Sequence, residues 1–203
     1  MNKINEFFGK VLCINLDRRP DRWEEVQKEF ERHGRLAVER LAAVDGKLHP
    51  VLGRLTPGET GCRMSHVAAL EIAAQSAKPT LILEDDVEFQ DYFVNFFADH
   101  IDGLPEWDLL YLGGNHVLSL TNGKFPVGRL RRTFTTSSYA VNARSAKELL
   151  SAIKNIPGQI DIAYAQLQPR LRCYAFDPPL AWQRPGYSDI QEGEVNYKKA
   201  MKK

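Results

Sequence analysis

The chain has few cysteines, no long apolar run and almost no net charge, and each absence excludes a class of protein. Its three cysteines, Cys13, Cys62 and Cys173, are widely separated and odd in number, so they do not form the disulfide framework of a small secreted domain. No segment has the length of apolar sequence that spans a bilayer, and residues 1–6 lack the apolar core of a signal peptide. We therefore expect a cytoplasmic protein.

The near balance of charge also limits the partners. With 27 basic and 26 acidic residues the formal net charge is +1, which predicts no nucleic-acid partner and no general attraction to a membrane. The single basic run is Arg129-Leu130-Arg131-Arg132. It fits either a binding site for an anionic ligand or a solvated strand face, and it leaves peripheral membrane association open. The sequence carries no indication of the oligomeric state.

What the chain does have is a regular alternation of strand and helix patterns. Its 203 residues and 43% apolar content suit one globular domain, which we place at residues 1–192, with a polar tail at 193–203 that we expect to fray. Strands are predicted at 10–16, 80–83, 107–112, 133–141 and 172–176, and helices at 20–33, 57–77, 91–101, 145–156 and 161–168. A hairpin-like region is predicted at 116–132 with its turn at 122–123, and a loop with a short strand at 42–46. Such alternation predicts an α/β fold with a mostly parallel sheet covered by helices on both faces.

The most informative segment is an acidic cluster that follows a buried strand. The apolar run 80–83 leads directly into Glu84, Asp85 and Asp86. Side chains that follow a strand lie at the carboxyl edge of the sheet, where α/β proteins bind ligands. Closely packed carboxylates repel each other, and Mg²⁺ or Mn²⁺ among them relieves the repulsion. The alternative is a solvated acidic turn or a helix cap.

A second polar segment follows the first strand. Asn15 and Asp17 come directly before Arg18 and Arg22, at what we expect to be the nucleotide-binding edge of the sheet. Guanidinium groups match the geometry of phosphate oxygens, so both arginines are candidates to bind a diphosphate. The alternative is that Asp17 caps the following helix and the arginines are surface charges.

The segment around His66 holds reactive side chains that do not form a familiar catalytic pair. Ser65 and His66 are adjacent on a predicted helix and point about 100° apart, which argues against a nucleophile–base pair. Cys62 and His66 are four residues apart and could share a metal, but two ligands do not make a structural zinc site.

Five short motifs occur in one order along the chain. They are Asn15-Leu16-Asp17-Arg18-Arg19-Pro20-Asp21-Arg22, Gly61-Cys62-Arg63-Met64-Ser65-His66, Leu83-Glu84-Asp85-Asp86-Val87, Trp107-Asp108-Leu109-Leu110-Tyr111-Leu112-Gly113-Gly114 and Gly186-Tyr187-Ser188-Asp189-Ile190. This succession, over about residues 10–192, resembles glycosyltransferase family 25, which includes bacterial lipooligosaccharide galactosyltransferases and procollagen galactosyltransferases. The resemblance implies an A-type glycosyltransferase fold and transfer of a hexose, commonly galactose, from a UDP-sugar to a glycan or glycolipid hydroxyl with inversion.

The resemblance also implies roles for individual residues. The acidic cluster stands at the place of the Asp-x-Asp metal motif, so Asp86 and Glu84 would hold Mn²⁺ or Mg²⁺. Glu84 is alternatively placed on the ribose or on a metal-bound water, and Asp85 can exchange roles with either. The residues expected to bind the donor are Asn15, Asp17, Arg18, Arg22, Asp45 (in the loop that contacts the uracil), His66, Glu84, Asp85 and Ser188.

An inverting transfer requires a base that takes the proton of the acceptor hydroxyl. The resemblance favours Asp161, at the start of a short predicted helix, and a plain helix cap is the alternative for it. Asp189 is the second candidate base, or it closes over the donor phosphates. Two other functions stay open from the sequence: a non-catalytic nucleotide-sugar-binding protein, and a metal-dependent phosphodiesterase, which would need additional His or Asp ligands for a two-metal site.

Overall fold

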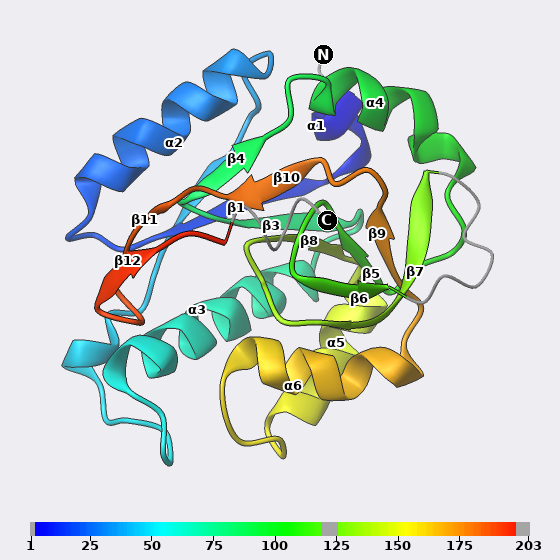
Figure 1. The fold of residues 1–203 in the computed structure, drawn as a ribbon. Coiled ribbons are helices and arrows are strands. Elements are labelled where there is room, and N and C mark those ends of the chain that lie inside the picture. The colour runs from blue at the N-terminus through cyan, green and yellow to red at the C-terminus, as the bar shows by residue number, and fades with distance from the viewer. Residues whose placement is uncertain (1–2, 119–125, 198–203) are drawn as a thin grey trace.

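The computed structural model describes residues 3–118 and 126–197, and it shows a central sheet between two layers of helices (Figure 1). The sheet has eight strands in the order β2-β1-β3-β8-β5-β9-β7-β6. Six of them run in one direction, and only β7 and β8 are antiparallel to their neighbours. The strands are β1 (Lys10–Asn15), β2 (Glu39–Ala42), β3 (Thr80–Glu84), β5 (Leu109–Tyr111), β6 (His116–Leu118), β7 (Val127–Thr133), β8 (Ser138–Val141) and β9 (Cys173–Phe176).

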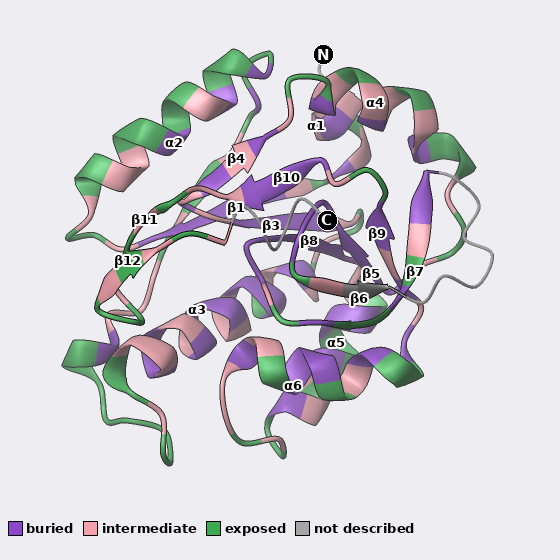
Figure 2. Cartoon of the chain, in the orientation of Figure 1, coloured by how far each residue is buried: buried purple, intermediate pink, exposed green. Residues whose placement is uncertain are grey.

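Both faces of the sheet are buried because apolar residues alternate between them. In β1, Val11 and Cys13 belong to one hydrophobic core, whereas Leu12 and Ile14 belong to the other. Three helices cover the first face: α1 (Lys3–Phe7), α2 (Pro20–Arg32) and α4 (Phe93–His100). The second face is covered by α3 (Pro57–Ala73), α5 (Ala143–Ile153) and α6 (Ile160–Leu167). The strands are accordingly buried and the outer sides of the helices exposed, as Figure 2 shows.

Two small antiparallel sheets lie beside the main one. β4 (Val87–Phe89) pairs with β10 (Ala181–Gln183), and β11 (Gly186–Ser188) pairs with β12 (Gly193–Val195). The backbone N–H of Arg184 donates to the carbonyl of Asp86 over 2.7 Å. These contacts bring the C-terminal part of the described chain to the end of the acidic cluster, although the two are about a hundred residues apart in sequence.

The sequence located the main elements and missed these small strands. The predicted hairpin at 116–132 is confirmed by the pairing of β6 with β7, while its turn at 122–123 lies outside the described residues. The strand predicted at 133–141 was wrong in its first half, because β7 ends at Thr133 and β8 begins at Ser138. Residues 193–195, in the segment expected to fray, form β12. Three short 3₁₀ helices complete the fold, at Gly46–Leu48, Ile101–Gly103 and Gln168–Arg170.

None of the helices in residues 3–118 and 126–197 has the combined length and apolar character that crossing a membrane requires.

A buried arginine on α3 holds the segment that precedes α6. The Arg63 guanidinium is 8% exposed and donates to the carbonyls of Ile153, Ile156 and Gly158 over 2.6–2.7 Å. These carbonyls lie at the end of α5 and in the loop after it, where Gly158 has a φ of +100°. The contact fixes the start of α6 against α3, and with it the position of Asp161.

We expect Arg63→Met to lower the free energy of unfolding by about 2–4 kcal/mol, because three hydrogen bonds from a buried guanidinium to backbone carbonyls are lost. Chemical denaturation measures this change. Arg170→Met is the matched control, since Arg170 is exposed, and it should change the stability by less than about 0.5 kcal/mol. Equal stability of the two variants would contradict the structural role of Arg63.

Candidate active site

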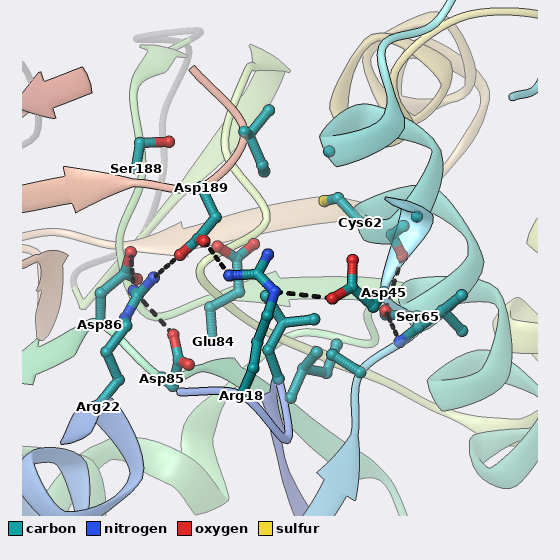
Figure 3. Close-up of a pocket in the computed structure, with 18 of the residues that line it drawn as sticks. Arg18, Arg22, Asp45, Cys62, Ser65, Glu84, Asp85, Asp86, Ser188 and Asp189 are labelled. Carbon is teal, nitrogen blue, oxygen red and sulfur yellow. Dashed lines mark hydrogen bonds and ion pairs between the residues drawn. The ribbon is translucent and has the colours of Figure 1, made fainter. Parts of the chain in front are cut away.

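A cavity of about 110 Å³ lies at the carboxyl ends of β1 and β3. Its walls come from the β1–α2 loop, the segment after β2, one face of α3, the end of β3, and the segment around β11. Among the residues predicted to be functional, those that line it are Arg18, Arg22, Asp45, His66, Glu84, Asp85, Asp86, Ser188 and Asp189. The structure therefore brings together most of the predicted site from five separate parts of the chain (Figure 3).

Arg22 is the counter-charge of the acidic cluster. Its Nη2 lies 2.7 Å from Asp85 Oδ1 and 2.6 Å from Asp86 Oδ2. Asn15 Nδ2 donates to the other oxygen of Asp85 over 2.7 Å, and Gln183 Nε2 donates to Asp86 Oδ2 over 2.9 Å. Asp86 Oδ1 is buried and has no hydrogen-bond partner among the residues that the structure describes.

One arginine does not neutralise the cluster. Burial raises the pKa of Asp85 to about 6, against the lowering effect of Arg22, and Asp86 adds to the increase. Burial likewise raises the pKa of Asp86, again opposed by Arg22 and reinforced by Glu84. Both pKa values are raised, as expected for buried carboxylates whose negative charge is only partly neutralised.

Glu84 faces a different set of partners. Its Oε1 lies 3.2 Å from His66 Nε2 and accepts a hydrogen bond from Thr136 Oγ1 over 3.0 Å. Burial acts to raise its pKa, but the contacts with His66 and Thr136 outweigh it and hold the pKa of Glu84 below the usual range. The three carboxylates thus differ: Asp85 and Asp86 share Arg22, and Glu84 is turned toward α3.

The C-terminal segment closes a second ionic network over the cavity. Arg18 Nε donates to Asp45 over 2.7 Å, and Arg18 Nη1 donates to Asp189 over 2.5 Å. Arg19 Nη1 donates to the other oxygen of Asp189 over 2.5 Å, and Arg22 lies 4.0 Å from it. Figure 3 shows Asp189 between Arg22 and Arg18. Burial raises the pKa of Asp189, but the two guanidinium groups more than offset this and lower it overall.

A second cavity, of about 620 Å³, adjoins the first. The residues that line both cavities are Cys62, Glu84, Gln183, Ser188 and Ile190. Asp161 lines only the second, where burial raises its pKa. The N-cap of α6 is Gln159, and Asp161 lies in the first turn with Oδ1 accepting from the N–H of Ile162 over 2.7 Å. Asp161 is therefore not the N-cap residue.

Two of the predicted site residues, Asn15 and Asp17, do not line the first cavity. The side chain of Asp17 is 78% exposed and pairs with Arg40 over 2.7 Å, so it is not part of the lining. Asn15 is buried behind the cavity, where it positions Asp85. Asp45, predicted to lie in the loop that contacts the uracil, lines the first cavity. It accepts from Arg18 and caps the short helix at Gly46 through the N–H of Lys47.

Three lining or supporting residues were missed by sequence reasoning. Arg19 directly follows Arg18 in the sequence, and it donates a hydrogen bond to Asp189. The run of arginines was the sequence signal that could have included Arg19 among the candidates. Gln183 has no sequence signal, because its position follows from the pairing of β10 with β4. Thr136 lies in the segment predicted to be strand, and its role depends on the loop between β7 and β8.

Two glycines let the segment after β2 approach α3 closely. A Cβ on Gly61 would lie 2.5 Å from the carbonyl oxygen of Val44, and a Cβ on Gly46 would lie 1.8 Å from the carbonyl oxygen of Pro57. Both neighbours are backbone atoms, so neither position accepts a side chain without moving the wall of the cavity. Ser65 completes the contact, since its Oγ accepts from the N–H of Val44 over 2.9 Å.

A family model described as glycosyltransferase family 25 (LPS biosynthesis protein) matches residues 8–131. The chain belongs to glycosyltransferase family 25. The match confirms the family that the sequence motifs indicated. The eight-stranded, mostly parallel sheet with helices on both faces is accordingly the A-type glycosyltransferase fold that was predicted.

Some curated relatives are named as galactosyltransferases, and others are named as inactive members of the family. A glycosyltransferase 25 family member from Aedes aegypti is 31% identical over 69% of this chain and 27% of its own length. Procollagen galactosyltransferase 1 from Danio rerio is 29% identical, with coverage of 71% and 29%. The human inactive glycosyltransferase 25 family member 3 is 30% identical, again with coverage of 71% and 29%. The chain thus spans less than a third of the length of these relatives.

Solved structures with a similar arrangement are remote in sequence. A Drosophila galactosyltransferase 7 mutant in complex with manganese, UDP-Gal and xylobiose is 11% identical, with a TM-score of 0.46 and coverage of 94% of this chain and 72% of that chain. A glycosyltransferase involved in glycosylation of the major capsid of PBCV-1 is 14% identical, with a TM-score of 0.45 and coverage of 83% and 81%.

We expect Arg22→Met to destabilise the fold by about 2–4 kcal/mol, because Asp85 and Asp86 lose their shared counter-charge. Millimolar Mn²⁺ should raise the melting temperature of this variant more than that of the wild type, since the carboxylates then take their positive charge from the ion. Thermal unfolding with and without Mn²⁺ measures both effects. Arg131→Met on the exposed side of β7 is the control and should show neither. Wild-type stability in Arg22→Met would contradict the pairing.

Proposed function

We propose that this chain is a metal-dependent glycosyltransferase that transfers a hexose, specifically galactose, from a UDP-sugar to a hydroxyl of a glycan acceptor with inversion. The observation that carries the proposal is the pair of adjoining cavities. The first holds arginines and clustered carboxylates suited to a nucleoside diphosphate, the second holds Asp161, and Glu84 lines both. Family membership and the galactosyltransferase names among the relatives support the choice of reaction and sugar.

The excess of carboxylates over basic side chains in the lining of the first cavity favours the binding of a divalent cation. Its lining has five carboxylates, from Asp45, Glu84, Asp85, Asp86 and Asp189, against the three basic side chains of Arg18, Arg22 and Lys47. A diphosphate is itself an anion, so it needs further positive charge to enter this cavity. The buried and unpartnered Oδ1 of Asp86 is a hard oxygen of the kind that Mg²⁺ and Mn²⁺ take.

These residues fit the expected ion. Asp86, with Glu84 beside it, would hold Mn²⁺ or Mg²⁺. Such an ion stabilises the negative charge that develops on the departing diphosphate. The chain's own contribution is to hold the carboxylates in place, which it does through Arg22, Asn15 and Gln183.

The arginines bind the other side of the diphosphate. Arg18 and Arg19 already point at a pair of anionic oxygens, those of Asp189, in the arrangement that guanidinium groups use for phosphate. A diphosphate that displaces the Asp189 carboxylate meets two oriented donors. In the free protein the two arginines lower the pKa of Asp189, and its carboxylate holds their guanidinium groups in place. Asp161 lines the second cavity and is the preferred base.

Asp161 takes the proton of the acceptor hydroxyl. It is half-buried in the second cavity, and its raised pKa gives it more affinity for a proton than an exposed aspartate has. Attack from this cavity on a sugar held in the first places the nucleophile and the leaving diphosphate on different sides of the anomeric carbon, as inversion requires.

The acceptor that fits best is a glycan with anionic groups, as in a lipooligosaccharide. The loop from Phe134 to Ser137 lines the second cavity and continues directly from β7. On that strand Arg131 and Arg132 are exposed, and Arg132 lies 5.5 Å from the centre of the Phe134 ring. An exposed aromatic ring beside cationic groups offers both a stacking surface for a sugar and charges for a phosphate.

A nucleotide-sugar-binding protein without activity is the second candidate, favoured by the inactive names among the relatives. The carboxylates of both cavities are all in place in this chain, which favours an enzyme. For a phosphodiesterase the comparisons give no support, because the family model and the relatives described above are glycosyltransferases by name.

The first test is metal-coupled donor binding. UDP should raise the melting temperature strongly with Mn²⁺ and weakly without it, and Asp86→Asn should remove the metal-dependent part. The same variant should hydrolyse and transfer UDP-galactose at least about 100-fold more slowly, because charge on the leaving group is no longer stabilised. Asp99→Asn, an exposed aspartate on α4, is the control. Equal turnover in wild type and Asp86→Asn would remove the catalytic assignment.

The second test separates the two candidate bases. Asp161→Asn should lower transfer to acceptor by about 100-fold or more while UDP–Mn²⁺ binding stays at the wild-type level. In the wild type, kcat/KM should fall as the pH is lowered through the raised pKa of Asp161, because the protonated carboxyl accepts no proton. If Asp189→Asn shows this pattern and Asp161→Asn transfers normally, the base is Asp189.

A further inference from the structure

Three side chains that could bind a metal ion lie close together between the two cavities. They offer a thiol and an imidazole as well as a carboxylate, unlike the purely carboxylate cluster at Asp85 and Asp86. The thiol of Cys62, a ring nitrogen of His66 and a carboxylate oxygen of Glu84 all lie within 4.8 Å of one another. Cys62 and His66 are one helical turn apart on α3, and Glu84 is the last residue of β3. The sequence offered only the first two, and the packing of α3 beside the end of β3 adds the third.

The histidine is already oriented as a ligand. His66 Nδ1 lies 3.0 Å from the hydroxyl of Tyr139, which lies 3.0 Å from the hydroxyl of Tyr164. His66 Nε2 lies 3.2 Å from Glu84 Oε1 and donates to it when Nδ1 accepts from Tyr139. In the other tautomer Nδ1 donates to Tyr139, and Nε2 is then free to bind a cation beside Glu84. A hydrogen bond from the second ring nitrogen is the usual support of a metal-bound histidine.

The carboxylate is supported as well. Thr136 Oγ1 donates to Glu84 Oε1 over 3.0 Å, which holds this oxygen on the side of the cavity that His66 lines. In Figure 3 the sulfur of Cys62 is turned toward the cavity in which Glu84 lies. A ligand set of one thiol, one imidazole and one carboxylate is thus held by α3, β3 and the β7–β8 loop.

We propose that Cys62, His66 and Glu84 form a binding site for a late first-row divalent ion of the zinc type. Thiolate and imidazole ligands favour Zn²⁺ over Mg²⁺ and Mn²⁺, which prefer oxygen. Three protein ligands leave a fourth position of the tetrahedron free. Because Cys62 and Glu84 line both cavities, that position opens to solvent there and takes a water molecule or a hydroxyl group.

This site is separate from the oxygen site proposed at Asp86. The ligands of the two sites differ in softness, and Asp86 is held on the opposite side by Arg22 and Gln183. The two proposed sites share Glu84 and differ in their other ligands, so substitution of Cys62 tests the thiol site and substitution of Asp86 tests the oxygen site.

Cobalt is the probe for the thiol site, because Co²⁺ replaces Zn²⁺ and a thiolate–Co²⁺ bond gives a charge-transfer absorption in the near ultraviolet. The Cys13→Ala/Cys173→Ala variant retains Cys62 as the only thiol among the three cysteines of the chain. Titration of this variant with Co²⁺ after treatment with a chelator should saturate at one ion per chain and show the thiolate band. Added Zn²⁺ should abolish the band by displacing the cobalt.

The discriminating variants are made in that background. Cys62→Ser should eliminate the thiolate band. Glu84→Gln should weaken Co²⁺ affinity by more than the roughly 10–100-fold that loss of a supporting hydrogen bond costs a metal site. Asp86→Asn should leave the band and the affinity unchanged, although it removes the Mn²⁺ effect on UDP binding. The far-ultraviolet circular dichroism of each variant shows that it is folded.

Two results would overturn the proposal. One is the absence of a thiolate band at saturating Co²⁺ in the folded Cys62-only protein. The other is unchanged Co²⁺ affinity in Cys62→Ser, which would place the ion elsewhere. Loss of the band in Asp86→Asn would count against two separate sites and would assign a single ion to the whole cluster.

Discussion

The candidate active site depends on the placement of three consecutive carboxylates at the end of a buried strand. Their mutual repulsion in a partly buried position must be offset, and Arg22 offsets part of it by pairing with Asp85 and Asp86. Burial, together with the neighbouring carboxylates, raises the pKa of both groups in spite of Arg22. Because Arg22 neutralises the carboxylates only in part, this edge of the sheet is suited to bind a cation and, through the cation, a diphosphate.

The arginines of the β1–α2 segment have a double role in this arrangement. Arg22 reaches inward to the acidic cluster, while Arg18 and Arg19 reach the carboxylate of Asp189. Asp189 comes from the turn between β11 and β12, so the C-terminal segment occupies the place where we propose that phosphate oxygens bind. Donor binding therefore exchanges one anionic partner of these arginines for another, and the guanidinium groups stay oriented throughout.

The residues of the candidate site lie in two groups, one on the side of α2 and one on the side of α3. Asp86 and Arg22 lie on the side of α2, and Cys62, His66 and Glu84 lie on the side of α3. Glu84 stands between them because it is the last residue of β3, the strand that separates the two helices. A hard oxygen site and a softer mixed site can therefore lie close together without sharing a full ligand set.

The sequence alone determined the family, the main strands and helices, and the acidic and arginine motifs, because each of these depends on residues that are close together along the chain. It did not reveal β4, β10, β11 or β12, since strands of three residues form through their partners and carry little pattern of their own. For the same reason the tertiary structure decided that Arg18 and Arg19 face Asp189, that Asp17 lies outside the cavity, and that Glu84 joins Cys62 and His66. Such contacts join residues far apart in sequence, and only the packing of α2, α3 and the C-terminal segment around the end of β3 brings them together.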